Sequence, residues 1–440
     1  MSYKKNLIFF GQVGSRSGYG SRARDLVRSI IELDEYNVSI MQVGWGRTPE
    51  TGLDKEFDTD IISKVMTSNP LVKPDIFVQL DLPRDFKRFG DLNIGVTAGI
   101  ETNVAPPNWY GGANNMDIIL GSSEHSIRVL RETKYVKYAE DGKTILGNLE
   151  LNPKVKLDTL FEGVNTDIFK TINVNNAGGD LSSRLDSINE KFCFLFVGMW
   201  VDGVLGEDRK DVGMLIKTFC ETFISNPPSF RPALVLKVNG GNFSYVDNYQ
   251  IEEKISSILE GFTNPPNVYI LHGDLTDEEM NILYNHNKIK AMVTFTKGEG
   301  FGRPLLEFSF VGKPIIASSF GGQNDFLHKD YTVKLPGKAT KVHPSVVNDW
   351  IVKDSEWFTV DYFYASQVLK NVFNNYENFL KLAKGQKKYV ENNFTRKLMG
   401  ERFKKIVDDF YSGKREEKNI LTNLNIKLPE LKKIKLNKED

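Results

Sequence analysis

A glycine-rich segment over residues 296–307, reading TKGEGFGRPLLE, joins a short apolar run to an amphipathic stretch. The run over 291–295 predicts a buried parallel strand, and Pro304 suits the first position of the helix that would follow, where its missing N–H costs nothing. Unpaired backbone N–H groups at a helix start attract phosphates, and Gly300 and Gly302 would let the backbone approach a ligand without an intervening Cβ. The segment therefore predicts a phosphate-binding loop.

Two carboxylates lie in this segment, Glu299 and Glu307, and a phosphate alone would repel both. A carboxylate beside a diphosphate is tolerated where it faces hydroxyl groups, because these donate hydrogen bonds to it. We therefore expect one ligand that carries both phosphates and sugars.

A pair of cations, Arg209 and Lys210, follows the apolar run over 192–198. Arginine can fork to two phosphate oxygens and lysine can act as a point charge, so the pair could neutralise a diphosphate leaving group. The alternative is a solvated helix start, which is the commoner role of adjacent cations. The position just after a predicted strand favours the diphosphate role.

A second glycine-rich turn follows the first predicted strand at residues 11–21, with Gly18, Tyr19 and Gly20 leading into a helix. Such a turn binds anions through backbone N–H groups, and it also occurs where only tight packing is required. The next strand ends in MQVGW at 41–45, without the acidic residue that holds a ribose in dinucleotide folds. This argues against NAD.

Polar and aromatic residues follow the predicted strand over 93–98, namely Glu101 and Asn103 and then Trp109 and Tyr110. The carboxylate and the amide could hold a sugar or an acceptor hydroxyl, and aromatic rings pack against sugar faces. A helix-capping loop with buried aromatics is the alternative.

Two further polar motifs are interpreted as structural. His125 opens a helix and is expected to be a cap or a surface group rather than a catalyst. The Asp-Thr-Asp sequence at 58–60 precedes a helical pattern and follows no strand, so helix capping explains it better than metal binding. No metal is expected.

The composition limits the class of protein. The chain has 440 residues, of which 40% are hydrophobic, and suits two domains of roughly 200 residues. Lys plus Arg and Asp plus Glu number 57 each, so no net charge indicates nucleic acid. Cys193 and Cys220 lie in apolar segments, as reduced core thiols do, and we see no signal segment or membrane-spanning run. A soluble, cytoplasmic protein is expected.

Short apolar runs alternate with amphipathic stretches, which predicts an α/β protein with two doubly wound Rossmann-like domains. The carboxyl ends of their strands would face a shared cleft, where the candidate residues meet. The expected strands lie at 6–11, 37–43, 75–80, 93–98, 117–121 and 157–161, and then at 192–198, 233–238, 268–271, 291–295, 314–318 and 332–335.

The domain boundaries follow from a polar stretch in the middle of the chain. We expect an N-terminal domain over 1–170, a linker over 171–190 and a C-terminal domain over 191–390. Residues 391–440 would form a helix that packs back toward the N-terminal domain and a lysine-rich tail.

Residues 298–322 resemble the signature of retaining GT-B glycosyltransferases of family 4, formerly group 1. In that signature two glutamates separated by seven residues precede a GKPIIAS run and a Gly-Gly turn. The stretches at 161–169 and 269–273 also resemble this family, and the likeness extends over 5–412. It implies a GT-B fold with an N-terminal acceptor domain and a C-terminal nucleotide-sugar domain, a UDP-sugar as donor, no cofactor and no metal.

The resemblance implies roles for the residues of the C-terminal domain. Lys210 corresponds to the family's diphosphate lysine, with Arg209 as its partner. Glu307 would accept hydrogen bonds from the ribose hydroxyls, and Glu299 would lie near the transferred sugar. The backbone of Gly300, Phe301 and Gly302 would hold sugar hydroxyls or phosphate.

In the N-terminal domain the likeness is looser. Gly18, Tyr19 and Gly20 match the loop that approaches the diphosphate when the cleft closes. No residue matches the histidine that the family often has near the sugar, and Glu101 or Asn103 would take its place.

The reaction implied is retaining transfer of a hexosyl or pentosyl group to an acceptor hydroxyl. A phosphorylase, an epimerase and a catalytically silent sugar-nucleotide binding protein are the alternatives. The acceptor stays open among saccharide, lipid, protein and hydroxymethylated DNA base, as does the oligomeric state. The DNA hypothesis rests on a likeness of 93–102 to phage-encoded glycosyltransferases and on the basic tail, and would place the protein in the host cytoplasm.

Overall fold

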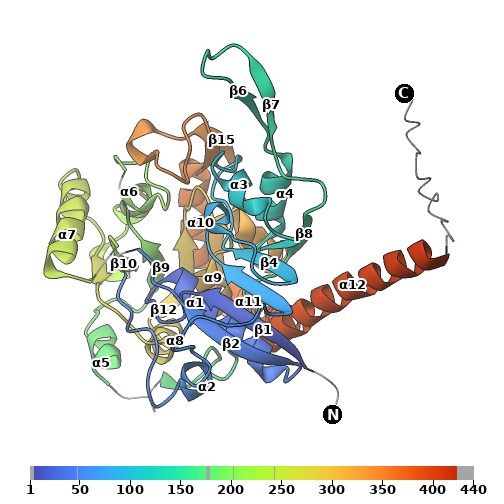
Figure 1. Ribbon diagram of the computed structural model, residues 1–440. Coiled ribbons are helices and arrows are strands. Elements are labelled where there is room, and N and C mark those ends of the chain that lie inside the picture. The colour runs from blue at the N-terminus through green and yellow to red at the C-terminus, as the bar shows by residue number, and fades with distance from the viewer. Residues whose placement is uncertain (1–3, 47, 175–178, 202, 242, 424–440) are drawn as a thin grey trace, which may run out of the picture.

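The computed structural model describes residues 4–46, 48–174, 179–201, 203–241 and 243–423, with side chains described to residue 413 (Figure 1). It has two α/β domains, each built on a six-stranded sheet. All neighbouring strands in both sheets run parallel. The expected α/β architecture of two doubly wound domains is confirmed.

The N-terminal sheet has the strand order β2-β1-β3-β4-β5-β8. Its central strands β3 and β4 are buried at every position, whereas the edge strand β2 is partly exposed. This is why the central strands consist mostly of apolar residues. The strands are β1 (Lys5–Gly11), β2 (Tyr36–Gln42), β3 (Ile76–Leu80), β4 (Leu92–Thr97), β5 (Ile118–Gly121) and β8 (Lys156–Thr159), and the helices are α1 (Gly18–Glu32), α2 (Thr59–Ile62), η1 (Pro83–Asp85), α3 (Trp109–Ala113) and α4 (Glu124–Glu132).

The C-terminal sheet has the order β11-β10-β9-β12-β13-β14. The strands are β9 (Cys193–Met199), β10 (Ala233–Asn239), β11 (Val268–Leu271), β12 (Ile289–Thr294), β13 (Ile315–Ser318) and β14 (Val333–Leu335). The helices are α5 (Asp180–Asp186), α6 (Val212–Phe223), η3 (Pro228–Phe230), α7 (Tyr245–Leu259), α8 (Asp277–Asn285), α9 (Arg303–Ser309), η4 (Gly322–Asp325), η5 (Pro344–Val346), α10 (Tyr362–Asn374) and α11 (Tyr376–Asn393).

Two antiparallel hairpins were not expected from the sequence: β6 (Tyr135–Tyr138) with β7 (Ile145–Leu149), and β15 (Gly337–Lys341) with β16 (Glu356–Val360). The first stands out from the body of the molecule at the top of Figure 1. Both are two-stranded and carry no long apolar run, so they lack the pattern that marks the strands of the main sheets.

The last helix, α12 (Arg396–Asn423), returns to the N-terminal domain. Met399, Phe403, Val407 and Phe410 are buried in the same cluster as residues of α1 and β1. The lysine-rich stretch at 432–438 lies outside the described residues.

The polar stretch over 171–190 contains α5, whose Leu181 and Leu185 are buried in the core of the C-terminal domain. Residues 175–178 of this stretch lie outside the described residues. Part of the expected linker therefore belongs to the second domain's packing.

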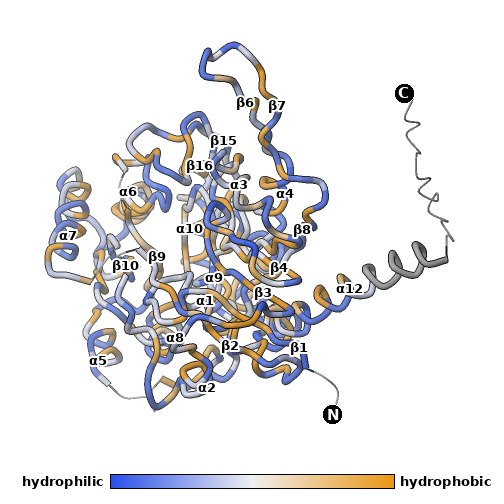
Figure 2. Tube along the Cα trace, in the orientation of Figure 1, coloured by the Kyte–Doolittle hydropathy of each residue, from blue (hydrophilic) through white to orange (hydrophobic). Residues whose placement is uncertain are grey.

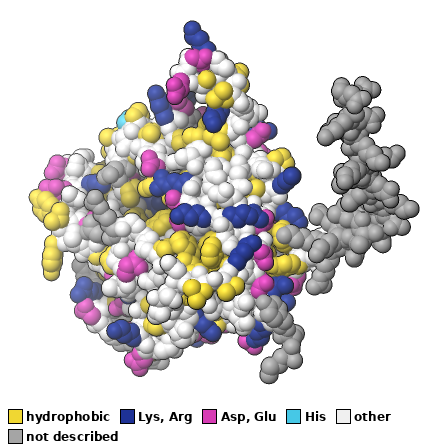
Figure 3. All heavy atoms as spheres, viewed as in Figure 1, with side chains coloured by type: hydrophobic (Ala, Val, Ile, Leu, Met, Phe, Trp, Pro, Cys, Tyr) yellow, Lys and Arg dark blue, Asp and Glu magenta, His cyan; other side chains and the backbone are white. Residues whose placement is uncertain are grey.

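The hydrophobic residues follow the sheets, and in Figure 2 the hydrophobic colour runs along β1, β2 and β3 at the centre of the view. On the face shown in Figure 3, both Lys and Arg and Asp and Glu side chains occur, and several Lys and Arg side chains gather near the middle of the view. Among the described residues, the structure contains no helix with both the length and the hydropathy needed to cross a membrane.

Candidate functional site

The predicted phosphate-binding loop connects β12 to α9, at the carboxyl edge of the C-terminal sheet. Gly302 is the N-cap of α9 with φ of 98°, a left-handed conformation that glycine adopts without strain. Pro304 is the second residue of α9 and not the first. It still lies in the first turn, where backbone N–H groups have no partner within the helix, so the N–H that proline lacks is not missed. Because α9 has only 7 residues, its dipole adds little to anion binding.

The glycines of this loop also face the N-terminal domain. A Cβ on Gly298 would overlap the carbonyl oxygen of Glu101, and one on Gly300 would overlap that of Ala98. The Ser123 hydroxyl donates to the Gly300 carbonyl at 2.7 Å. In this structure these glycines thus allow the two domains to approach each other closely. The ligand contact expected of Gly300 stays a prediction.

The four predicted catalytic side chains, Glu101, Arg209, Lys210 and Glu299, lie together and form what we call the charge network. Lys210 Nζ donates to Glu299 Oε1. Arg209 Nε lies 3.0 Å from Glu101 Oε2, and its Nη1 lies 3.6 Å from Glu299 Oε1. Their side chains are between 12% and 27% exposed, so water reaches them only partly.

The network joins both domains, because Glu101 follows β4 while the cations follow β9 and Glu299 follows β12. Burial and the neighbouring Arg209 lower the pKa of Lys210 well below its usual value, while Glu101 opposes this shift. Two cations face two carboxylates, so an incoming diphosphate would compete with the carboxylates for the same cations.

Glu307 lies apart from the charge network, in a second cluster between the domains. Its oxygens accept from Arg303 Nε at 2.7 Å and from the Tyr284 hydroxyl at 3.0 Å. Arg303 also pairs at 2.5 Å with Asp25 of α1. Burial raises the pKa of Glu307 to about 7, with Arg303 opposing the shift.

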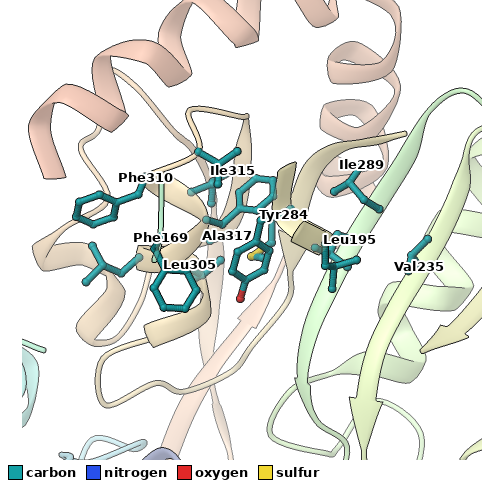
Figure 4. Close-up of a cluster of buried hydrophobic side chains, with 14 of the residues drawn as sticks. Phe169, Leu195, Val235, Tyr284, Ile289, Leu305, Phe310, Ile315 and Ala317 are labelled. Carbon is teal, nitrogen blue, oxygen red and sulfur yellow. The ribbon is translucent and has the colours of Figure 1, made fainter. Parts of the chain in front are cut away.

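Tyr284 connects this cluster to the apolar core of the C-terminal domain. Figure 4 shows its ring among Phe169, Ala317 and Leu305, with the hydroxyl oxygen at the edge of the cluster. The ribose contact expected of Glu307 remains a prediction, since both of its oxygens already have a protein donor.

The glycine-rich turn of the N-terminal domain makes several contacts within the protein, and the ligand contact expected of it stays a prediction. The Gly20 N–H donates to the Ser17 hydroxyl at 3.1 Å, which caps α1. The Tyr19 ring stacks on Trp45 at 4.1 Å between centroids, and burial raises the pKa of its hydroxyl. Gly18 has open space around it.

Two of the secondary interpretations are wrong. His125 is neither a cap nor a surface group: Ser123 caps α4, and the His125 ring packs against Phe320 of the other domain at 4.9 Å. It is 7% exposed, and burial lowers its pKa to about 4. Asp58 occupies the N-cap of α2 without a side-chain cap bond.

The two carboxylates of the Asp-Thr-Asp motif instead bind one cation. Asp58 and Asp60 accept from Arg28 of α1, each at 2.6 Å. Among the described residues, no group of at least three His, Cys, Asp or Glu side chains is arranged to hold a metal ion.

The aromatic pair after β4 does not face a sugar, because Trp109 and Tyr110 are 2% and 0% exposed in the N-terminal core. Asn103 ties the domains together through the backbone of Glu356, which accepts from its N–H at 2.9 Å and donates to its side chain at 2.8 Å. The structural alternative is therefore correct for the buried aromatics, whereas Asn103 caps no helix and the sugar contact expected of it stays a prediction.

Sequence reasoning missed the ionic residues behind the loops. Lys297 and Asp211 form a buried pair at 3.5 Å, and Asp25 reaches Arg303 across the domains. Lys297 and Arg303 flank the glycine loop in the sequence, so their charge and position could have indicated that they belong to the site. Nothing in the sequence marks Asp25, which lies within a helix of the other domain.

A search of known protein families finds no match to this chain, and no curated protein sequence matches it. Solved structures do match in fold. Sucrose-phosphate synthase from Thermosynechococcus elongatus aligns with a TM-score of 0.61 at 12% identity, over 93% of this chain and 100% of that one. Anabaena HepE, in complex with UDP and glucose, aligns with 0.56 at 11% identity, over 92% and 99%.

WaaG, a glycosyltransferase of lipopolysaccharide biosynthesis, aligns with a TM-score of 0.55 at 11% identity, over 90% of this chain and 98% of its own. At identities this low the likeness extends to the fold alone. The two facing α/β domains are thus of the GT-B kind.

Proposed function

We propose that this protein is a glycosyltransferase that moves a sugar from a nucleotide-sugar donor, a UDP-sugar in the first instance, to an acceptor hydroxyl. The observation that carries the proposal is the charge network, in which two cations and two carboxylates from both domains converge where the sheets face each other. The fold neighbours include HepE bound to UDP and glucose, which supports this donor class.

Donor binding requires the domains to separate, because the backbone at Gly298 and Gly300 touches the N-terminal domain. Separation would break the contact between Glu101 and Arg209 and free the guanidinium. Arg209 could then fork to two oxygens of the diphosphate, with Lys210 as a second positive charge. The cations would act most strongly after the domains close again and exclude water.

We propose transfer with retention and without a metal. The bond between the sugar carbon and the diphosphate oxygen breaks, and its electron pair stays on the diphosphate, which Arg209 and Lys210 stabilise. The acceptor oxygen attacks the same face of the sugar, and its proton passes to a diphosphate oxygen. Glu299 would lie near the positive charge that develops on the sugar.

Thermal shift with UDP-, GDP- and ADP-sugars tests the donor. We expect UDP-sugars to raise the melting temperature of the wild type, and Lys210→Ala to abolish the shift. If no nucleotide sugar shifts the wild type, or if Lys210→Ala responds as the wild type does, the proposal is wrong.

Turnover separates transfer from the alternatives. Release of UDP that needs an added acceptor indicates transfer, whereas donor consumption with phosphate or water alone indicates a phosphorylase or an epimerase. The acceptor arms are saccharides, lipid-linked sugars, peptides, and plain and hydroxymethylated duplex DNA at several salt concentrations, since DNA binding weakens steeply with salt.

A further inference from the structure

Two charged pairs cross between the loops that follow β9 and β12 in the C-terminal domain. Lys210 of the first loop pairs with Glu299 of the second, and Lys297 of the second pairs with Asp211 of the first at 3.5 Å. Each loop thus supplies one cation and one carboxylate to the other. The first pair belongs to the charge network, and the second lies behind it, with side chains only 2% and 0% exposed.

Asp211 is held in an unusual backbone conformation at the start of α6. Its φ of 53° is left-handed, which a residue with a side chain keeps only where its surroundings hold it. The Tyr362 hydroxyl of α10 donates to Asp211 Oδ2 at 2.6 Å, and the Leu215 N–H donates to the Asp211 carbonyl at 3.0 Å. Both its backbone and its side chain are therefore fixed, next to Lys210.

Lys297 is fixed in the same way, beside Gly298 and Glu299. Its N–H donates to the Arg209 carbonyl at 2.8 Å, and its own carbonyl accepts from the Phe358 N–H at 2.8 Å. Its Nζ donates to the Thr359 hydroxyl at 2.8 Å. The pair therefore fastens the loop that carries the cations to the loop that carries the glutamate.

Stability alone explains this pair poorly. A buried ion pair is often no more stabilising than apolar residues of the same volume. Asp211 Oδ1 has no hydrogen-bond partner among the described residues, which adds to the cost of burying the carboxylate. Burial raises the pKa of Asp211 to about 7, against the effect of Lys297 and with a smaller contribution from Asp208. The pair does fix the position of the two loops relative to each other.

We propose that Asp211 and Lys297 are positioning residues, which hold Arg209 and Lys210 against Glu299 and set the rate of transfer without touching either substrate. This inference rests on the proposed function. A misplacement of about an ångström in a reacting group lowers the rate about a hundredfold. Loss of the Asp211–Lys297 pair, directly behind the charge network, should therefore lower the rate of transfer measurably.

The test uses Asp211→Asn, Lys297→Met and the double variant in a donor-transfer assay. We expect each single variant to lose kcat by at least about tenfold while the donor KM changes by less than about threefold, because the network is misplaced rather than removed. The double variant should lose no more than the worse single variant, because the pair acts as one unit.

Asp208→Asn is the matched control. Asp208 is a buried carboxylate of the same loop, 1% exposed, and its Oδ2 accepts from the Val212 N–H at 3.3 Å. We expect it to keep kcat within about twofold and the melting temperature close to that of the wild type, because the asparagine oxygen can still accept from the Val212 N–H. Where Asp211→Asn does not fold, Tyr362→Phe removes only the hydroxyl bond to Asp211 and should lower kcat with an unchanged KM.

Amide hydrogen exchange over residues 296–301, read without substrate, provides an outcome independent of turnover. Faster exchange there in Asp211→Asn and Lys297→Met, and not in Asp208→Asn, supports the positioning role of the pair. This holds even if the wild type transfers from no nucleotide sugar, and in that case only the proposed function fails. The positioning role is wrong if the folded single variants or Tyr362→Phe keep the wild-type kcat. It is also wrong if the losses in the double variant are additive, or if the exchange is unchanged. In each of these cases an active wild type still supports the proposed function.

Discussion

The Arg209 guanidinium of the C-terminal domain lies 3.0 Å from the Glu101 carboxylate of the N-terminal domain. The same guanidinium donates to the Gly298 carbonyl at 3.1 Å, on the loop that touches Glu101 through its backbone. The Arg209 guanidinium is therefore paired with the N-terminal domain as long as the domains touch at Glu101. A diphosphate that takes this cation must replace a carboxylate that already holds it.

Glu101→Gln should tighten UDP binding. The substitution removes a carboxylate that competes with the diphosphate for Arg209, and a partly exposed ion pair of this kind contributes about 0.2–1 kcal/mol, or roughly 1.5- to 5-fold in Kd. Titration calorimetry with UDP measures it, and Glu132→Gln, at the exposed last residue of α4, is the control. Weaker binding by Glu101→Gln would mean that Glu101 contacts the donor instead of competing with it.

Lys210→Ala should lower kcat/KM by about a hundred- to a thousandfold, the loss seen when one donor to a developing negative charge is removed. Lys210→Arg, which keeps the charge, should recover part of the activity. Lys370→Ala, an exposed lysine on α10, should be as active as the wild type. Equal activity of the two alanine variants in a UDP-release assay would exclude Lys210 from the reaction.

Gly300→Ala should push the domains apart. A Cβ at this position overlaps the Ala98 carbonyl, so the interface must open or the loop must shift. We expect a larger radius of gyration by small-angle X-ray scattering and a melting temperature lower by several degrees, about 1–3 kcal/mol of overpacking.

Gly111→Ala is the matched control for that experiment, because a Cβ there meets nothing within 4 Å. It lies in α3, where alanine is preferred to glycine, so its melting temperature should not fall. Identical scattering and melting of Gly300→Ala and the wild type would contradict the close approach of the domains.

Glu307→Gln should change how stability depends on pH. Burial raises the folded-state pKa of Glu307 from 4.5 to about 7, so between these values the native state binds a proton that the unfolded state has lost. The neutral carboxyl of Glu307 contributes to the free energy of unfolding in full below the unfolded-state pKa. This contribution is lost as the pH rises to the folded-state pKa. Stability therefore falls with rising pH in this window by up to about 1.4 kcal/mol per pH unit.

Urea unfolding between about pH 5 and about pH 7 measures this effect, since the free energy of unfolding responds directly to the difference in bound protons. The variant's curve should be flatter than that of the wild type, because glutamine does not titrate and all other groups are common to both. Parallel curves would show that Glu307 is ionised throughout, paired with Arg303.

The central strands of both sheets could be located from the sequence because they are short runs of mostly apolar residues that parallel pairing buries on two faces. The loop at 296–307 was recognisable for the same local reason, since its glycines and Pro304 adjoin such a run. The β6–β7 and β15–β16 hairpins could not be located in this way, because β6, β7 and β15 are largely exposed and β16 has only two buried positions.

The amino-acid sequence by itself determined the two α/β domains and the residue types at the carboxyl ends of their strands, because burial and turn chemistry act over a few neighbouring residues. Only the tertiary structure decided the partners: Glu101 with Arg209, Lys210 with Glu299, and Asp25 with Arg303. Those pairings join segments far apart in the chain, and charge attraction has no periodicity that would reveal them. Two of them form where the two domains meet, and Lys210 meets Glu299 because β9 and β12 are neighbours in one sheet.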